Sequence, residues 1–230
     1  MTDVVIAGGG PSGLAAAIMA RQAGLNVTVY EPRPFPIDKA CGEGLMRPAL
    51  ETLAALGIDD LPGIDFAGIR YVDGQQVAEG RFRYGAGRGV RRTVLQRALR
   101  DRAEQLGVTL VPRPLTNWRQ AADHVEFEGS RARYLIAADG LNSPIRRALK
   151  LDAPSKQPAR LGLRRHFAVA PWSEFVEVYW VELVDRLAPE ADHVRTCDET
   201  TAPEHLNSSD IGQEGPSPKT RDDCQQVESE

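Results

Sequence analysis

The sequence has little cysteine, no long apolar run and no concentrated basic segment. Its three cysteines stand far apart among 230 residues, without a C-x-x-C pair. This spacing predicts neither a disulfide framework nor a metal site, so reduced thiols are expected. The first apolar stretch, residues 4–7, is too short for a signal-peptide core or a membrane span. We therefore expect no stable membrane insertion and a cytoplasmic location.

Charge is distributed unevenly along the chain. Residues 183–230 contain twelve acidic and four basic side chains, a net charge of −8, so the remainder of a chain whose total is −4 carries +4. The mild positive charge of residues 1–182 favours a ligand that carries phosphates. Basic residues are not interleaved with aromatic ones, so we expect no nucleic-acid partner. The acidic end has few large apolar residues, which predicts a disordered tail over residues 185–230.

The first thirty residues predict a strand, a helix and a second strand, the usual size of a βαβ-type unit. The first strand covers residues 4–7 and runs into three glycines. Pro11 suits the first turn of the helix, and Gly24 ends it. The second strand covers residues 27–30. This order predicts an α/β fold with a Rossmann-like domain.

The spacing of apolar residues predicts the later elements. Expected helices cover residues 45–56, 92–106 and 143–149. Expected strands cover residues 69–72, 76–84, 108–111, 115–118, 124–128, 133–138, 161–170 and 175–184.

The pattern Gly8-x-Gly10-x-x-Gly13 lies between the first predicted strand and helix, with Pro11 and Ser12 inside it. Gly8 permits a sharp turn, the missing side chain at Gly10 lets a pyrophosphate approach, and Gly13 allows close helix packing. Unpaired N–H groups and the helix dipole then face the anion. A glycine-rich turn without any ligand is the alternative.

Glu31 closes the second strand, 21 residues after Gly10. Its carboxylate can accept hydrogen bonds from both hydroxyls of an adenosine ribose, and it would repel a 2′-phosphate. A carboxylate at this position argues against NADP as the nucleotide bound at the glycine turn. FAD and NAD are comparable candidates on this motif alone.

Four spaced motifs extend the pattern. They are residues 4–33, Asp38-Lys39-x-Cys41-Gly42-Glu43-Gly44, Arg92-x-x-Leu95 and Ala138-Asp139-Gly140-x-x-Ser143-x-x-Arg146. In this order they resemble FAD-dependent monooxygenases of the hydroxybenzoate hydroxylase type and the related geranylgeranyl reductases. The resemblance covers about residues 2–182, and the Cys-Gly-Glu-Gly run favours the reductase branch. It makes FAD the favoured cofactor.

The resemblance implies roles for individual residues near the adenosine and the phosphates. Glu31 is the expected ribose ligand, with Arg33 beside it at the usual basic position. Arg92 would be the first residue of a helix that lies under the cofactor, and its side chain would reach the phosphates. The alternative is an arginine that is only solvated. Asp139 and Gly140 would lie near the pyrophosphate and take part in nicotinamide cofactor use. A simple turn and helix cap is compatible with the same two residues.

The resemblance also places Cys41 and Gly42 near the flavin ring. A small, half-buried side chain is the alternative for Cys41. Glu43 could donate a proton, but a loop carboxylate is more often only solvated. His166 falls on a strand of the expected substrate region, where a lone histidine is more often structural. No catalytic residue is assigned.

The predicted domains follow from these motifs. Residues 1–158 form a discontinuous FAD-binding domain with a β-rich segment at about 62–90, residues 159–184 begin the substrate-domain sheet, and residues 185–230 are the acidic tail. A second signature of complete relatives, Gly-Asp followed by small residues, is missing. The break in composition motivates the hypothesis of a truncation or reading-frame change near residues 182–185.

The implied activity is that of an FAD-dependent monooxygenase or reductase with NAD(P)H as a transient reductant and a small organic molecule as substrate. In such enzymes the reduced flavin serves either hydroxylation with oxygen or reduction of a carbon–carbon double bond. Two alternatives remain, a catalytically inactive dinucleotide-binding fragment and an NAD-dependent dehydrogenase. The sequence does not predict the oligomeric state.

Overall fold

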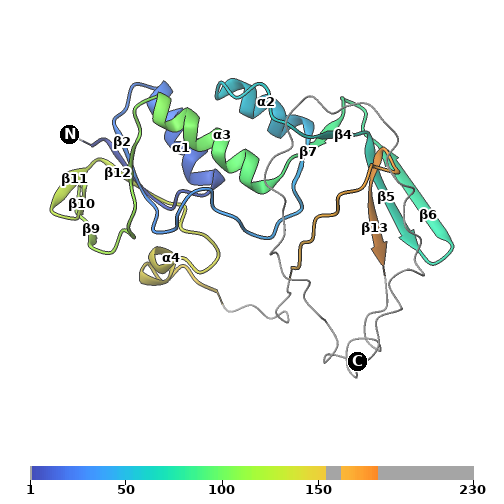
Figure 1. Cartoon of the computed structure of the whole chain (residues 1–230). Coiled ribbons are helices and arrows are strands. Elements are labelled where there is room, and N and C mark those ends of the chain that lie inside the picture. The colour runs from blue at the N-terminus through green and yellow to red at the C-terminus, as the bar shows by residue number, and fades with distance from the viewer. Residues whose placement is uncertain (1, 154–161, 181–230) are drawn as a thin grey trace, which may run out of the picture. The chain divides into compact units, whose positions relative to one another are not determined.

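A four-stranded parallel sheet organises the N-terminal part of the chain (Figure 1). The computed structural model describes residues 2–153 and 162–180. The strand order is β12-β1-β2-β8, and Val4 of β1 pairs with Val27 of β2 and Tyr134 of β12. These strands are β1 (Val4–Ala7), β2 (Val27–Tyr30), β8 (Thr109–Val111) and β12 (Tyr134–Ala137). The carboxyl ends of parallel strands are where an open α/β sheet binds ligands.

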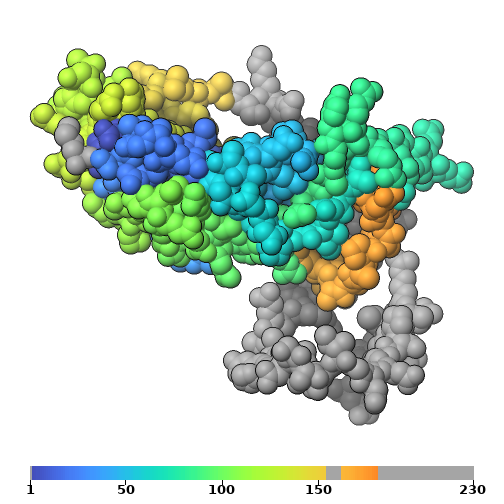
Figure 2. Space-filling model, turned by 90° about the horizontal axis from the view of Figure 1, so that it is seen from above, coloured from blue at the N-terminus to red at the C-terminus, as the bar shows by residue number. Residues whose placement is uncertain are grey.

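Helices α1 (Pro11–Gln22) and α3 (Arg92–Gln105) cover one face of this sheet. Figure 2 shows residues of the two helices side by side on one surface. Side chains of alternate strand residues, such as Val4 and Ile6, point to this face because strand side chains alternate. The helices meet them with five buried apolar residues, Leu14, Ala17, Ile18, Leu99 and Ala103.

A three-stranded antiparallel meander covers the opposite face. It consists of β9 (Trp118–Gln120), β10 (Val125–Phe127) and β11 (Ser130–Ala132). Val5 of β1 and Tyr30 of β2 point to this side, and the rings of Tyr30 and Phe127 meet edge to face, 6.2 Å between centroids. The central strands are therefore buried on both faces, which explains their continuous apolar sequence.

Two smaller sheets and two further helices complete the described part. One sheet has the order β3-β7-β4 and the other β13-β5-β6. Their bounds are β3 (Gly44–Leu45), β4 (Ile64–Phe66), β7 (Gly87–Gly89), β5 (Gly68–Asp73), β6 (Gln76–Arg81) and β13 (Phe175–Trp180). The helices are α2 (Arg47–Ala55) and α4 (Pro144–Ala148).

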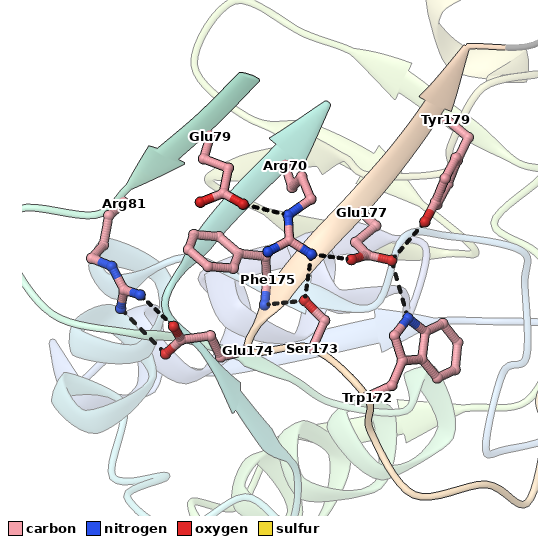
Figure 3. A network of polar contacts seen from close by, with 9 residues as sticks. All are labelled: Arg70, Glu79, Arg81, Trp172, Ser173, Glu174, Phe175, Glu177 and Tyr179. Atoms are coloured by element: carbon pink, nitrogen blue, oxygen red, sulfur yellow. Dashed lines mark hydrogen bonds and ion pairs between the residues drawn. The ribbon is translucent and has the colours of Figure 1, made fainter. Parts of the chain in front are cut away.

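A polar network fastens β13 to β5 and β6 (Figure 3). Arg70 of β5 donates to Glu79 at 2.6 Å and to Glu177 at 2.5 Å. Arg81 of β6 forms an ion pair with Glu174. The Phe175 ring lies about 5 Å from the guanidinium carbons of both arginines. Charge pairing and cation–π contacts thus hold a strand that is more than 90 residues from its partners in the chain.

The α/β fold expected from the sequence is confirmed. The first two strands have the expected bounds, and α1 begins at Pro11 as expected. The strand expected over residues 161–170 is wrong, because residues 162–170 pair with no strand in the part of the chain that the structure describes, and their side chains are mostly exposed. The strand expected over residues 115–118 begins only at Trp118, and its apolar Leu115 instead packs against the sheet from a loop.

The expectations for residues 154–161 and 181–230, including the acidic tail, lie outside the described residues. The three predicted domain boundaries remain predictions. Across residues 2–153 and 162–180, no helix has the length and apolarity needed to cross a bilayer. No cluster of three or more metal-binding side chains occurs in the same part of the chain.

Candidate functional site

The glycine turn between β1 and α1 is shaped by contacts that exclude side chains. Gly8 has φ of +104°, a conformation that L residues with side chains rarely adopt. A Cβ on Gly8 would overlap the backbone of Ala138, and a Cβ on Gly13 would overlap the carbonyl oxygen of Gly8. Both glycines are therefore required for the turn to lie against the end of β12.

Gly10 serves a different purpose. A Cβ built on it meets no atom within 4 Å, so space for the chain does not require glycine here. Gly10 is the N-cap of α1, with Pro11 at the first helical position and Ser12 exposed after it. The amides of Ser12 and Gly13 lie in the first turn, where N–H groups have no partner within the helix. Open space in front of such amides is what an anionic group needs.

Glu31 is the buried acid of the site. Its side chain is 3% exposed at the end of β2, and Oε2 accepts a hydrogen bond from the Gly9 amide at 2.8 Å. Burial acts to raise the pKa of Glu31, but hydrogen bonds from Arg33 and Gly9 outweigh it, and the pKa is lowered. The carboxylate therefore stays ionised at neutral pH, in the state that accepts hydrogen bonds from hydroxyl groups.

Arg33 occupies the remaining acceptor positions of Glu31. Its backbone N–H and Nε donate to Oε1 at 3.0 and 2.9 Å, and its Nη2 donates to Oε2 at 3.1 Å. A carboxylate has about four acceptor positions, and with Gly9 all four are used. The Arg33 side chain is 53% exposed, so it can rotate away and free two positions. Two hydroxyl groups of a ribose would take those places.

A cavity of about 490 Å³ lies at the carboxyl ends of the parallel strands. Five of the predicted residues line it, namely Gly8, Glu31, Arg33, Asp139 and Gly140. A cavity of about 510 Å³ lies on the meander, but its lining residues Arg119 and Glu126 pair with each other, 2.8 Å apart, and Glu128 of the same lining pairs with Arg113. The first cavity is the better ligand site because the end of the glycine turn, Gly8, and the buried acid Glu31 meet in its wall. The predicted residues Gly10, Pro11, Ser12, Gly13 and Arg92 lie outside its lining.

Asp139 has a structural task in addition to its place in the cavity. Its Oδ2 accepts a long hydrogen bond, 3.4 Å, from the Ile145 amide, while Ser143 caps α4 by accepting from the Arg146 amide at 2.9 Å. Gly140 has φ of +89° and begins the turn into α4. The turn-and-cap interpretation of this motif therefore applies, and it is compatible with a ligand role.

Arg92 begins α3 and is tied to the Cys-Gly-Glu-Gly loop. Its backbone N–H donates to Glu43 Oε1 at 2.7 Å. Its Nε is buried and has no hydrogen-bond partner within the described ranges. A buried donor without a partner is costly, and a bound phosphate would satisfy it.

Glu43 contacts two residues of a segment that is distant in the sequence. Arg164 Nη1 donates to Glu43 Oε1 at 2.9 Å, and His166 Nε2 lies 2.7 Å from Glu43 Oε2. Burial acts to raise the pKa of Glu43, but the Arg92 amide, His166 and Arg164 together lower it. The Glu43 carboxylate thus links its own loop to the segment that contains Arg164 and His166, and it is not merely solvated. Cys41 and Gly42 are exposed on this loop and do not line the 490 Å³ cavity.

Sequence reasoning missed three residues of this region. Gly9 occupies an unspecified position of the glycine pattern, yet a Cβ there would press on the Glu31 side chain. Lys39 lines the cavity, although the sequence pattern gave it no role. Gln96 of α3 is fully buried and hydrogen-bonded to the Gly9 carbonyl. No local signal indicates a contact made 87 residues away.

These observations fit the adenosine and diphosphate parts of FAD. The glycine turn offers backbone donors, Glu31 offers acceptors for a diol, and Arg92 offers a buried Nε that has no hydrogen-bond partner among the described residues. A model of the FAD-binding domain family matches residues 1–226. The chain belongs to the FAD-binding domain family. The match continues past residue 182, where the resemblance noted from the sequence had ended.

Curated relatives and solved structures agree with this family. Over 56 residues the chain is 50% identical to menaquinone reductase of Mycolicibacterium smegmatis, an alignment covering 24% of this chain and 14% of that protein. Over 182 residues it is 29% identical to rifampicin monooxygenase of Streptomyces venezuelae, covering 70% and 36%. The chain therefore spans less than half of these relatives.

Among solved structures, a flavoprotein/dehydrogenase from Cytophaga hutchinsonii matches with a TM-score of 0.59 and 25% identity, covering 68% of this chain and 44% of that one. Anhydrotetracycline hydroxylase from Streptomyces rimosus matches with a TM-score of 0.54 and 28% identity, covering 68% and 35%. Both solved structures share the fold of about two thirds of this chain.

Proposed function

We propose that the chain is the FAD-binding part of a flavoprotein oxidoreductase that uses NAD(P)H as a transient reductant and acts on a small organic substrate. The observation that carries the proposal is the cavity where the glycine turn, buried Glu31 and Asp139-Gly140 meet. The similar proteins include a reductase, a monooxygenase and a hydroxylase. They support hydroxylation or double-bond reduction as the reaction class. A cytoplasmic location, where NAD(P)H is available, belongs to the same proposal.

The residues of the chain have separate tasks in this function. Glu31 accepts hydrogen bonds from the ribose hydroxyls after Arg33 has turned away. The Gly10, Ser12 and Gly13 amides donate to the diphosphate, and Arg92 adds positive charge. FAD, when bound, supplies two-electron transfer between the nicotinamide reductant and the substrate. Asp139-Gly140 shapes the wall that faces the diphosphate.

The first experiment is an absorbance spectrum of the full chain after FAD has been added and the excess removed. Flavin peaks near the molar amount of protein are the expected result, and NADPH oxidation would show in addition that this chain turns over and contradict the truncation hypothesis. A Gly10→Val variant should fold but lose the flavin, because its side chain fills the space in front of the amides. Retained flavin without NADPH oxidation would favour an inactive dinucleotide-binding fragment. A colourless wild-type protein would overturn the proposal.

A further inference from the structure

Gln96 is a buried polar residue whose place in α3 is not explained by packing. Its side chain is 0% exposed, and its Nε2 donates to the carbonyl oxygen of Gly9 at 2.6 Å. Its Oε1 is buried without a hydrogen-bond partner within residues 2–153 and 162–180. A carbonyl can only accept, so the amide nitrogen must face Gly9. Leucine or methionine would fill the same space without an unpaired acceptor.

The contact with Gln96 determines how the turn is oriented. The peptide bond between Gly9 and Gly10 is trans, and in a trans peptide the C=O and the following N–H point in opposite directions. Because the Gly9 carbonyl is held toward α3, the Gly10 N–H must point away from α3. The Gly9 N–H is held separately by Glu31 at 2.8 Å. Both peptide units that flank Gly9 are therefore fixed by side chains from other elements.

We propose that Gln96 is a positioning residue that aims the Gly10 N–H at the diphosphate of the cofactor. This inference rests on the proposed function, since it assumes a dinucleotide at the glycine turn. Its consequence is selectivity among ligands. Gln96 strengthens the binding of ligands that carry a diphosphate. It contributes little to the binding of a nucleoside, because a nucleoside is held at the end of the cavity that contains Glu31.

The test compares FAD, ADP and adenosine on the full chain. Gln96→Leu and Gln96→Met remove the hydrogen-bond donor and keep a side chain of similar volume. Two variants are used so that the test still stands if one of them does not fold. Gln105→Leu is the matched control, because Gln105 is exposed near the end of the same helix. Titrations are run well below the unfolding temperature of each variant, so that binding is measured on folded protein.

We expect the Gln96 variants to bind FAD and ADP about tenfold more weakly, the effect of about one lost hydrogen bond, with adenosine changed by less than about threefold. The Gln105→Leu control should match wild type. Equal losses for all three ligands, or no loss at all, would overturn the proposal, because a residue needed only for packing gives no diphosphate selectivity.

A second readout needs no ligand. In amide NMR spectra of the apo chain, the Gln96 variants should shift the Gly9 and Gly10 resonances and leave those of β12 unchanged. Unshifted Gly10 resonances would refute the role of Gln96. Failure of the wild-type chain to bind FAD would instead refute the proposed function, so the two ideas fail by different measurements.

Discussion

Gly10 and Gly13 stand three positions apart and meet opposite requirements. A Cβ on Gly10 enters open space, at φ −68° and ψ 175°, which any residue can adopt. A Cβ on Gly13 overlaps the Gly8 carbonyl. The first glycine therefore leaves room for a ligand, and the second leaves room for the chain itself.

We predict that Gly13→Ala lowers the free energy of unfolding by about 1–3 kcal/mol, the usual cost of overpacking. Gly10→Ala should change that free energy by less than about 0.5 kcal/mol yet weaken FAD binding about tenfold or more. Urea unfolding and flavin titration measure the two quantities. Gly162→Ala, an exposed position with no atom near its Cβ, is the control. A stability loss at Gly10 as large as at Gly13 would contradict this division.

Glu128 provides a test by pH. The amides of Asn117 and Thr116 donate to its carboxylate, each at 3.1 Å, and with Arg113 they lower the pKa of Glu128 to about 2 from an ordinary 4.5. A carboxylate whose pKa is depressed by folding stabilises the folded state fully above pH 4.5, and this contribution is lost as the pH falls toward 2.

We therefore expect the wild-type free energy of unfolding to fall between pH 4.5 and 2 more steeply than that of Glu128→Gln. The pKa itself can be read from the pH dependence of the Glu128 carboxyl carbon in NMR spectra. A midpoint near 4.5 would show that the loop hydrogen bonds do not hold the ionised form.

At the level of elements, β13 is held by side-chain pairing in addition to its backbone ladder with β5. Arg70 connects Glu79 of β6 with Glu177 of β13, and the Glu177 side chain is 9% exposed. We expect Arg70→Met to accelerate amide hydrogen exchange in β13 while leaving β1 unchanged. Arg119→Met, which removes an exposed pair on the meander, serves as the control. Unchanged exchange in β13 would mean that backbone pairing with β5 suffices.

Elements were predictable where their signals are local. The apolar run of β1, the proline at the start of α1 and the periodicity of α3 each lie within one segment, and all three appear as expected. The segment of residues 162–170 has the composition of a strand, yet a strand needs a partner to pair with, and among the described residues this segment has no ladder partner. The short strand β7 was missed because Gly87-Arg88-Gly89 has no strand propensity and is held by its two neighbours.

At the level of the whole molecule, the sequence could predict the parts of the site but not how distant parts support one another. Glu31 was predictable because the glycine pattern sets its distance along the chain. The hydrogen bond between Gln96 and Gly9 joins residues 87 positions apart, and Arg164 reaches Glu43 across 121. Such contacts depend on how helices and sheets pack together, which no local pattern records.

The contact between Gly8 and Ala138 also has a consequence for the order of events during biosynthesis. The Ala138 amide donates to Ala7, and its backbone closes the turn around Gly8. A ribosome adds Ala138 about 130 residues after Gly8, at a pace of roughly 5–20 residues per second. The glycine loop thus leaves the exit tunnel well before the residue that completes its final form. Cofactor capture by a nascent chain must wait until the strand that precedes Asp139 has emerged.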